Sequence, residues 1–214
     1  MLLRGINKVI RILIYSDFIL NSAWGFIGPV FAIFIVKNIT VGDPVSGARV
    51  AGFASLCYWI TKSLLQIPLS KGFDRKVGER DDYWFMFLGL LITGLSPFGF
   101  LISSLPWHIY LFQFLHATGM AMFIPSWNAV FTRHMDTKKA AYEWGMDSTL
   151  LGLGIGITGA CGGLLVAVLG FKLLFILTGF LTISSAFLLL LIHKEILPRD
   201  HLLPRLPFIR GRQF

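Results

Sequence analysis

The sequence predicts an all-α polytopic membrane protein that crosses the bilayer six times, and three observations lead to this fold class. Hydrophobic residues make up 55% of the 214 residues and charged residues only 14%, whereas a soluble domain carries about 25% charged residues. The mean hydropathy is accordingly high, at +0.72. The chain also contains six long apolar stretches, and its basic residues fall between them in an alternating pattern. This composition argues against a water-soluble domain, a disordered chain and a nucleic-acid-binding domain.

Each apolar stretch is long enough to be a membrane helix, which needs about 20 apolar residues. The predicted spans are residues 11–36, 50–70, 83–103, 108–131, 148–169 and 173–192. Only Gly170, Phe171 and Lys172 separate the last two spans. As one helix these two spans would measure more than about 60 Å, twice the thickness of the hydrocarbon core, so we expect a tight turn at Gly170.

The positions of the basic residues predict the orientation, because cytoplasmic loops are enriched in Lys and Arg. Three of the 19 basic residues lie at the N-terminal end up to the first residue of span one, four lie between spans two and three, three lie between spans four and five, and five follow span six. The opposite side has only Lys37, Arg49 and Lys172. Both termini are therefore expected in the cytoplasm, with residues 193–214 forming a basic tail. We expect a multi-pass protein of the cell membrane, plasma or inner.

Three ionisable residues lie inside predicted spans, where charged groups are costly and usually functional. At 1.5 Å per residue, Asp17 and Lys62 lie about 9 Å and about 12 Å from the cytoplasmic side. Their similar depths allow either an ion pair or a separate role for each residue in transport. His116 lies near the midplane, as an interhelical hydrogen-bonding residue or as a proton site.

The polar residues that accompany them extend this candidate site. Asn21 follows Asp17 by one helical turn, Gln113 shares a helix face with His116, and Trp24 and Asn128 lie on the same two spans. These residues are candidate contacts for a substrate. Glu143 and Asp147 are expected to stabilise the N-terminal end of the fifth span through the helix dipole.

Two short similarities suggest that spans one to three and four to six are inverted repeats. Residues 25–29 (GFIGP) correspond to residues 121–125 (AMFIP), and Gly72–Phe73 corresponds to Gly170–Phe171. The two groups of three spans begin on opposite sides of the membrane, and inverted three-helix repeats are typical of secondary transporters.

Two segments carry a family resemblance. The loop PLSKGFDRKVGER after the second span and the glycine-rich GLGIGITGACGGLL of the fifth span resemble motifs of the major facilitator superfamily. The resemblance implies a conformational latch formed by Asp74, Arg75, Gly78 and Arg80, although a merely solvated loop is the alternative. It also implies close helix packing at Gly154, Gly159 and Gly163.

The resemblance covers nearly the whole chain but only one half of the family's usual twelve-helix fold. It implies a secondary active transporter of a small molecule or ion that works as a homodimer of six-helix protomers, by alternating access and with proton coupling. Asp17 and His116 would then be the candidate proton-coupling residues. The alternatives are a non-transporting membrane scaffold and one half of a hetero-oligomeric transporter. No enzyme motif is found, and we expect neither a cofactor nor a bound metal ion. The expected partners are a second copy of the chain, the lipid bilayer and the substrate, with no nucleic acid.

Overall fold

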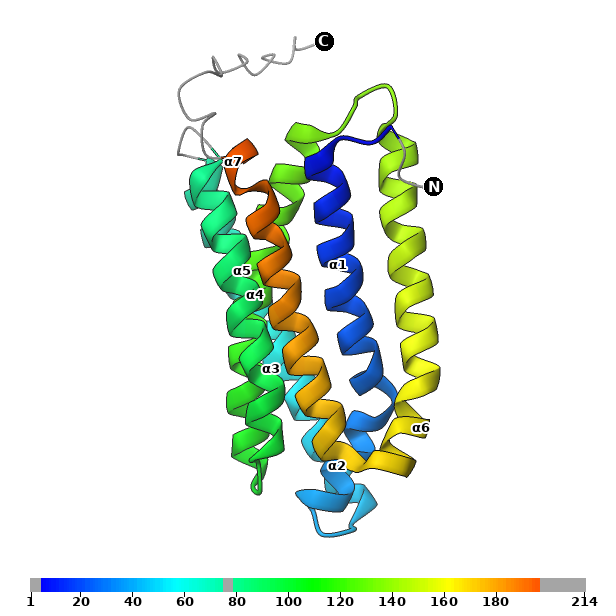
Figure 1. Ribbon diagram of the computed structural model, residues 1–214. Helices are drawn as coiled ribbons and strands as arrows, with labels where there is room; N and C mark the ends of the chain where they lie inside the picture. Colours follow the sequence, from blue (N-terminus) through cyan, green and yellow to red (C-terminus); the bar gives the residue numbers. More distant parts are fainter. Residues whose placement is uncertain (1–4, 75–78, 197–214) are drawn as a thin grey trace, which may run out of the picture.

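The computed structural model describes residues 5–74 and 79–196, without the side chains of residues 73 and 74. These residues form long helices that lie side by side in one bundle (Figure 1). In chain order the elements are α1 (Lys8–Ile27), η1 (Gly28–Val30), α2 (Phe31–Asn38), α3 (Pro44–Asp74), α4 (Arg80–Leu101), α5 (Pro106–His134), α6 (Ala140–Leu188), η2 (Leu189–Ile192) and α7 (His193–Ile196).

Prolines and glycines set several of the helix boundaries. Pro44 and Pro106 are the first residues of α3 and α5, a position where the missing backbone N–H costs nothing. Pro29 lies in η1, so the first predicted span is two helices joined by a tighter turn. The last helix, α7, continues the chain as helix beyond residue 192, where the sequence predicts only a tail.

The turn predicted at Gly170 is confirmed. Gly170 has φ 75° and ψ 172°, a conformation that side chains with a Cβ atom rarely adopt. It divides α6 into a first leg (residues 140–169) and a second leg (residues 171–188) that run in opposite directions (Figure 1). The two legs replace what would otherwise be a single helix too long for one crossing.

The most extensive packing joins α1 to α6 and α4 to α5, while α3 packs mainly against α5 and α2. Glycine allows the close approach of α4 and α5: a Cβ atom added to Gly89 would lie 2.6 Å from the carbonyl oxygen of Gly119. Hydroxyl groups join α1 to the second leg, since Ser185 donates to the Ser16 carbonyl (2.8 Å) and Thr178 donates to the Ala23 carbonyl (3.1 Å). These bonds satisfy polar groups that water does not reach.

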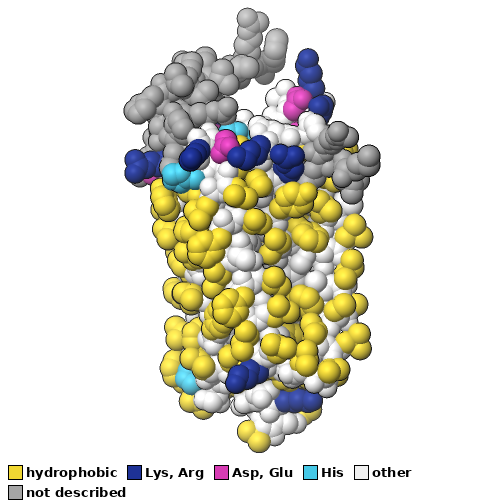
Figure 2. Space-filling model, in the orientation of Figure 1, with side chains coloured by type: hydrophobic (Ala, Val, Ile, Leu, Met, Phe, Trp, Pro, Cys, Tyr) yellow, Lys and Arg dark blue, Asp and Glu magenta, His cyan; other side chains and the backbone are white. Residues whose placement is uncertain are grey.

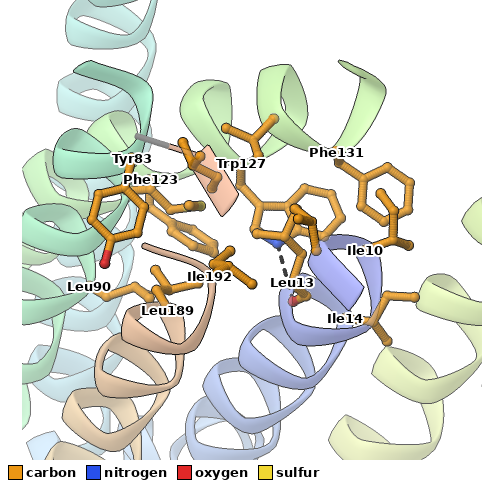
Figure 3. Close-up of a cluster of buried hydrophobic side chains, with 14 of the residues drawn as sticks. Ile10, Leu13, Ile14, Tyr83, Leu90, Phe123, Trp127, Phe131, Leu189 and Ile192 are labelled. Atoms are coloured by element: carbon orange, nitrogen blue, oxygen red, sulfur yellow. Dashed lines mark hydrogen bonds between the residues drawn. The ribbon is translucent and has the colours of Figure 1, made fainter. Parts of the chain in front are cut away.

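The apolar core has two parts, one in each half of the bundle length. Figure 3 shows the part near the chain termini, where Leu13, Tyr83 and Trp127 come from three different helices. The Trp127 indole N–H donates to the Leu13 carbonyl at 3.3 Å, so this buried polar group is also satisfied. The other part centres on Phe34, Phe100 and Phe175.

Charged and apolar residues are segregated on the surface. Figure 2 shows Asp, Glu and most of the visible Lys and Arg gathered at the upper end of the bundle, hydrophobic side chains covering the length below, and a few further basic side chains at the opposite end. Three helical segments of the described chain are long and apolar enough to cross a membrane: Lys8–Asn38, Arg80–Leu101 and Ala140–Ile196. The last of these contains both legs of α6. The protein is therefore a helical membrane protein.

The two sequence pairs that suggested an internal repeat differ in local structure. Gly170 has a positive φ and ends a helical leg, whereas Gly72 lies within α3. Pro29 lies in the break between α1 and α2, whereas Pro125 lies within the continuous helix α5. The inverted repeat therefore remains a proposal.

Candidate functional site

A pocket of about 240 Å³ lies between α3, α5 and the segment that runs from α1 through η1 to the start of α2. Each of the three segments contributes residues spaced three or four apart, so that each presents one face to the pocket. Most of the lining is apolar or aromatic, with polar side chains among it, and the lining residues are Trp24, Ile27, Gly28, Phe31, Ala51, Ser55, Tyr58, Gln113 and His116.

His116 is the centre of an aromatic stack that joins the three segments. Its ring lies 3.6 Å from that of Trp24 between centroids, with an interplanar angle of 9°. Tyr58 of α3 approaches the same imidazole at 4.7 Å. Within the described residues His116 Nδ1 has no hydrogen-bond partner, so stacking rather than an interhelical hydrogen bond holds the ring.

Two further polar atoms beside the pocket lack partners. Trp24 Nε1 and Gln113 Oε1 are buried, and nothing in residues 5–74 and 79–196 bonds to them. A buried polar atom without a partner is uncommon in folded proteins and is often satisfied by a bound molecule. The pocket therefore combines aromatic walls with unused hydrogen-bonding capacity.

Lys62 continues the pocket-facing side of α3. Ala51, Ser55 and Tyr58 line the pocket, and Lys62 follows Tyr58 by one turn on the same face. Its ammonium group lies 4.8 Å from the ring centroid of Trp59 and 5.8 Å from that of Tyr58. Asp17 is not its partner: the described residues contain no Asp17–Lys62 ion pair, and the Asp17 carboxylate instead accepts a hydrogen bond from Asn21 at 2.9 Å.

Asp17 and Asp147 form a second polar feature, between α1 and the first leg of α6. Both side chains are buried, and the two carboxyl groups interact electrostatically. Sequence reasoning assigned Asp147 to the N-terminal end of a helix, but α6 begins at Ala140, and Asp147 lies two turns inside it. Glu143 is the acidic residue of the first turn, and its carboxylate accepts a hydrogen bond from the Asp136 N–H.

The remaining predicted residues lie outside the pocket. Asn21 contacts Asp17 on α1, and Asn128 is exposed on α5. Sequence reasoning missed Tyr58, Ser55 and Phe31. The signal that could have revealed Tyr58 and Ser55 is a spacing on one helix face: Tyr58 precedes Lys62 by four residues, and Ser55 precedes Tyr58 by three.

Most of the predicted latch lies outside the described residues, namely Arg75, Gly78 and the side chain of Asp74. Its fourth member, Arg80, is the exposed first residue of α4. The same end of the bundle has an ion-pair cluster between α4 and α5. Its members are Glu79, Asp82, Arg133 and His134. Arg133 binds Asp82 (2.5 Å) and His134 Nε2 lies 2.8 Å from Glu79.

The three predicted packing glycines have different surroundings. A Cβ atom on Gly154 would lie 2.3 Å from Ser22 Oγ, so this glycine allows α6 to approach α1 closely. At Gly159 the nearest atom would be 3.8 Å away, an ordinary contact, and at Gly163 no atom of the described chain lies within 4 Å. Gly162, another glycine of the same glycine-rich segment, makes the close contact: its added Cβ would lie 2.3 Å from the Phe26 carbonyl oxygen.

A bundle of apolar helices around a solute-sized pocket with unpartnered polar atoms is characteristic of a membrane transport protein. The sequence profile of the Major Facilitator Superfamily matches residues 14–208, and the chain belongs to this family of membrane transporters. The family and the fold are those of transporters rather than enzymes.

One solved structure shows how much of a complete transporter fold the chain represents. The in meso crystal structure of the POT family transporter PepTSo superimposes with a TM-score of 0.76 at 16% sequence identity. The superposition covers 88% of this chain but only 38% of the PepTSo chain. No curated protein matches the sequence.

Proposed function

We propose that this chain is one protomer of a secondary active transporter for a small solute. The observation that carries the proposal is the pocket at His116, where three helices of a transporter fold surround unpartnered polar atoms. In this proposal six helical segments cross the cell membrane: α1 together with α2, then α3, α4, α5 and the two legs of α6. Both termini are cytoplasmic, and the first three segments and the last three are inverted repeats. The basic residues at one end of the bundle support this orientation.

A second copy of the chain would supply the other half of the transporter. The chain spans 38% of the length of PepTSo, which leaves a large part of that fold without a counterpart. The first leg of α6 also has an outward-facing series of small residues: Gly145, Gly152, Gly156 and Gly163 have no atom within 4 Å of an added Cβ. Small residues allow two membrane helices to approach closely. Alternating access would then be a rocking of one protomer against the other.

Asp17 and Asp147 support proton coupling. They are carboxyl groups on packed helices, and within the described residues neither makes an ion pair with a basic side chain. A carboxyl group in this setting can take up and release a proton as the surrounding helices move. Proton uptake with the solute would couple transport to a proton gradient.

Reconstitution of the purified chain in liposomes tests the proposal. A pH-sensitive dye inside the vesicles reports proton movement when a panel of small organic acids, amines, sugars and amino acids is added outside. Solute-dependent acidification with the wild-type chain, and none in empty liposomes, is the expected result. Native mass spectrometry should give a species of twice the 24.0 kDa chain mass. A clean monomer without proton movement would favour a membrane scaffold, and co-purification of a different six-helix chain would favour a hetero-oligomeric transporter.

A further inference from the structure

The chemistry of the pocket limits which solutes fit it. Its volume of about 240 Å³ is small for a ligand site. A cavity of about 150 Å³ in a protein core holds one benzene ring, so this pocket holds one ring and a substituent of a few atoms.

The walls favour a flat apolar ring. Trp24, Phe31 and Tyr58 contribute aromatic faces from two sides of the pocket, and Trp24 is already oriented by its stack on His116. Aromatic side chains bind another ring by offset stacking or by edge contacts. A fully extended aliphatic chain would leave much of this aromatic surface without a matching partner.

A charge beside the pocket, on the same face of α3 as three lining residues, favours an anion. Lys62 lies one turn beyond Tyr58 on the pocket-facing side of α3, and no carboxylate of the described residues lies within ion-pair distance of it. Its ammonium group lies over the faces of Trp59 and Tyr58, which stabilise it by cation–π contact. A cation inside a membrane protein normally has a counter-charge, and a bound solute can provide it.

Neutral polar groups complement this charge. The Trp24 indole N–H is an unused donor, and Ser55 adds a hydroxyl group between Ala51 and Tyr58 on the same helix face. Both groups can donate to a carboxylate oxygen. A cationic solute would instead meet the charge of Lys62.

We propose that the pocket between α1, α3 and α5 binds single-ring aromatic carboxylates, with the ring against Trp24, Phe31 and Tyr58 and the carboxylate toward Lys62. This inference rests on the proposed function, since it names the class of solute that the transporter carries. The probe that represents this class is benzoate.

Calorimetric titration of the full chain in lipid nanodiscs at neutral pH tests the inference. Benzoate is compared with benzyl alcohol, which lacks the charge, with benzylammonium, which reverses it, and with cyclohexanecarboxylate, which lacks the aromatic ring. Benzoate should bind at least about tenfold more tightly than each of the other three. Equal binding of benzoate and benzyl alcohol, or preferential binding of benzylammonium, would overturn the inference.

Variants of Lys62 identify the source of the preference. Lys62→Gln should remove the roughly tenfold preference for benzoate over benzyl alcohol, while Lys62→Arg should keep it. Lys172→Gln removes a positive charge from the exposed turn after Gly170 and should leave the preference unchanged. Retention of the full preference in Lys62→Gln would refute the assigned role of Lys62.

The outcomes also separate this inference from the proposed function. Benzoate binding without proton movement for any solute in liposomes would refute proton-coupled transport but keep the ligand class. Proton movement driven by another solute, without benzoate binding, would keep transport and refute the ligand class.

Discussion

The indole of Trp24 lies parallel to the imidazole of His116, 3.6 Å away between ring centroids, and this contact joins α1 to α5 beside the pocket. Truncation of the indole by Trp24→Ala should lower solute uptake by about tenfold or more, because the stack orients a wall of the binding site. Uptake into proteoliposomes and thermal unfolding are measured together. Trp107→Ala removes an exposed indole near the start of α5 and should leave uptake unchanged. Equal losses in both variants would contradict a specific role for the stack.

Asp17 should be required for coupling to protons. Asp17→Asn keeps the size of the side chain and its neighbour Asn21 but removes the group that takes up the proton. We expect uptake driven by a pH gradient to be abolished, while exchange of solute across the membrane without a gradient continues. Asp136→Asn changes an exposed carboxylate between α5 and α6 and is the matched control. A gradient response that survives in Asp17→Asn would assign coupling elsewhere.

Asp147 should share this role, because its carboxyl group interacts with that of Asp17 across the α1–α6 contact. Asp147→Asn is therefore expected to change the pH dependence of uptake, and the double variant should have no larger effect than Asp17→Asn alone. The measurement is the uptake rate as a function of external pH for the two single variants and the double variant. Additive effects would show that the two carboxyl groups act independently.

Arg133 should stabilise the fold at the end of the bundle that carries the chain termini. Arg133→Gln leaves the buried Asp82 carboxylate without its ion-pair partner, at a cost of about 1–3 kcal/mol since the arginine side chain is 36% exposed. Thermal unfolding in detergent should therefore begin several degrees lower. Lys138→Gln removes an exposed charge nearby and should change stability by less than about 0.5 kcal/mol. Equal stability of the two variants would contradict this assignment.

Gly163 lies on the outward face of the first leg and tests the proposed dimer. Gly163→Leu introduces a large side chain where the described chain has no atom within 4 Å, so the single chain should remain folded. The fraction of dimer in native mass spectra should fall, since a bulky residue prevents close helix approach. Ser184→Leu places the same side chain on the exposed face of the second leg and should leave the dimer intact.

The sequence alone was sufficient for the family, the helical class and the position of the sharpest turn. Hydropathy identified the apolar stretches because burial in lipid requires long apolar helices with internally satisfied backbone groups. The turn at Gly170 followed from length, because the residues around it are too many for one crossing. His116, Trp24 and Gln113 were also found from the sequence, since polar residues in apolar helices are rare enough to stand out.

The tertiary structure decided which of these residues meet. The sequence predicts similar membrane depths for Asp17 and Lys62. In the structure, however, Asp17 accepts a hydrogen bond from Asn21, while Lys62 lies against Tyr58 and Trp59. Similarly, Asp147 resembled a helix-terminal residue but is buried near Asp17, and Gly162 rather than Gly163 allows α6 to pack against α1. Hydropathy fixes the depth of a residue, because depth depends on its position within an apolar stretch. The direction in which its side chain points depends on helix rotation and packing, and these are determined only when the helices contact one another.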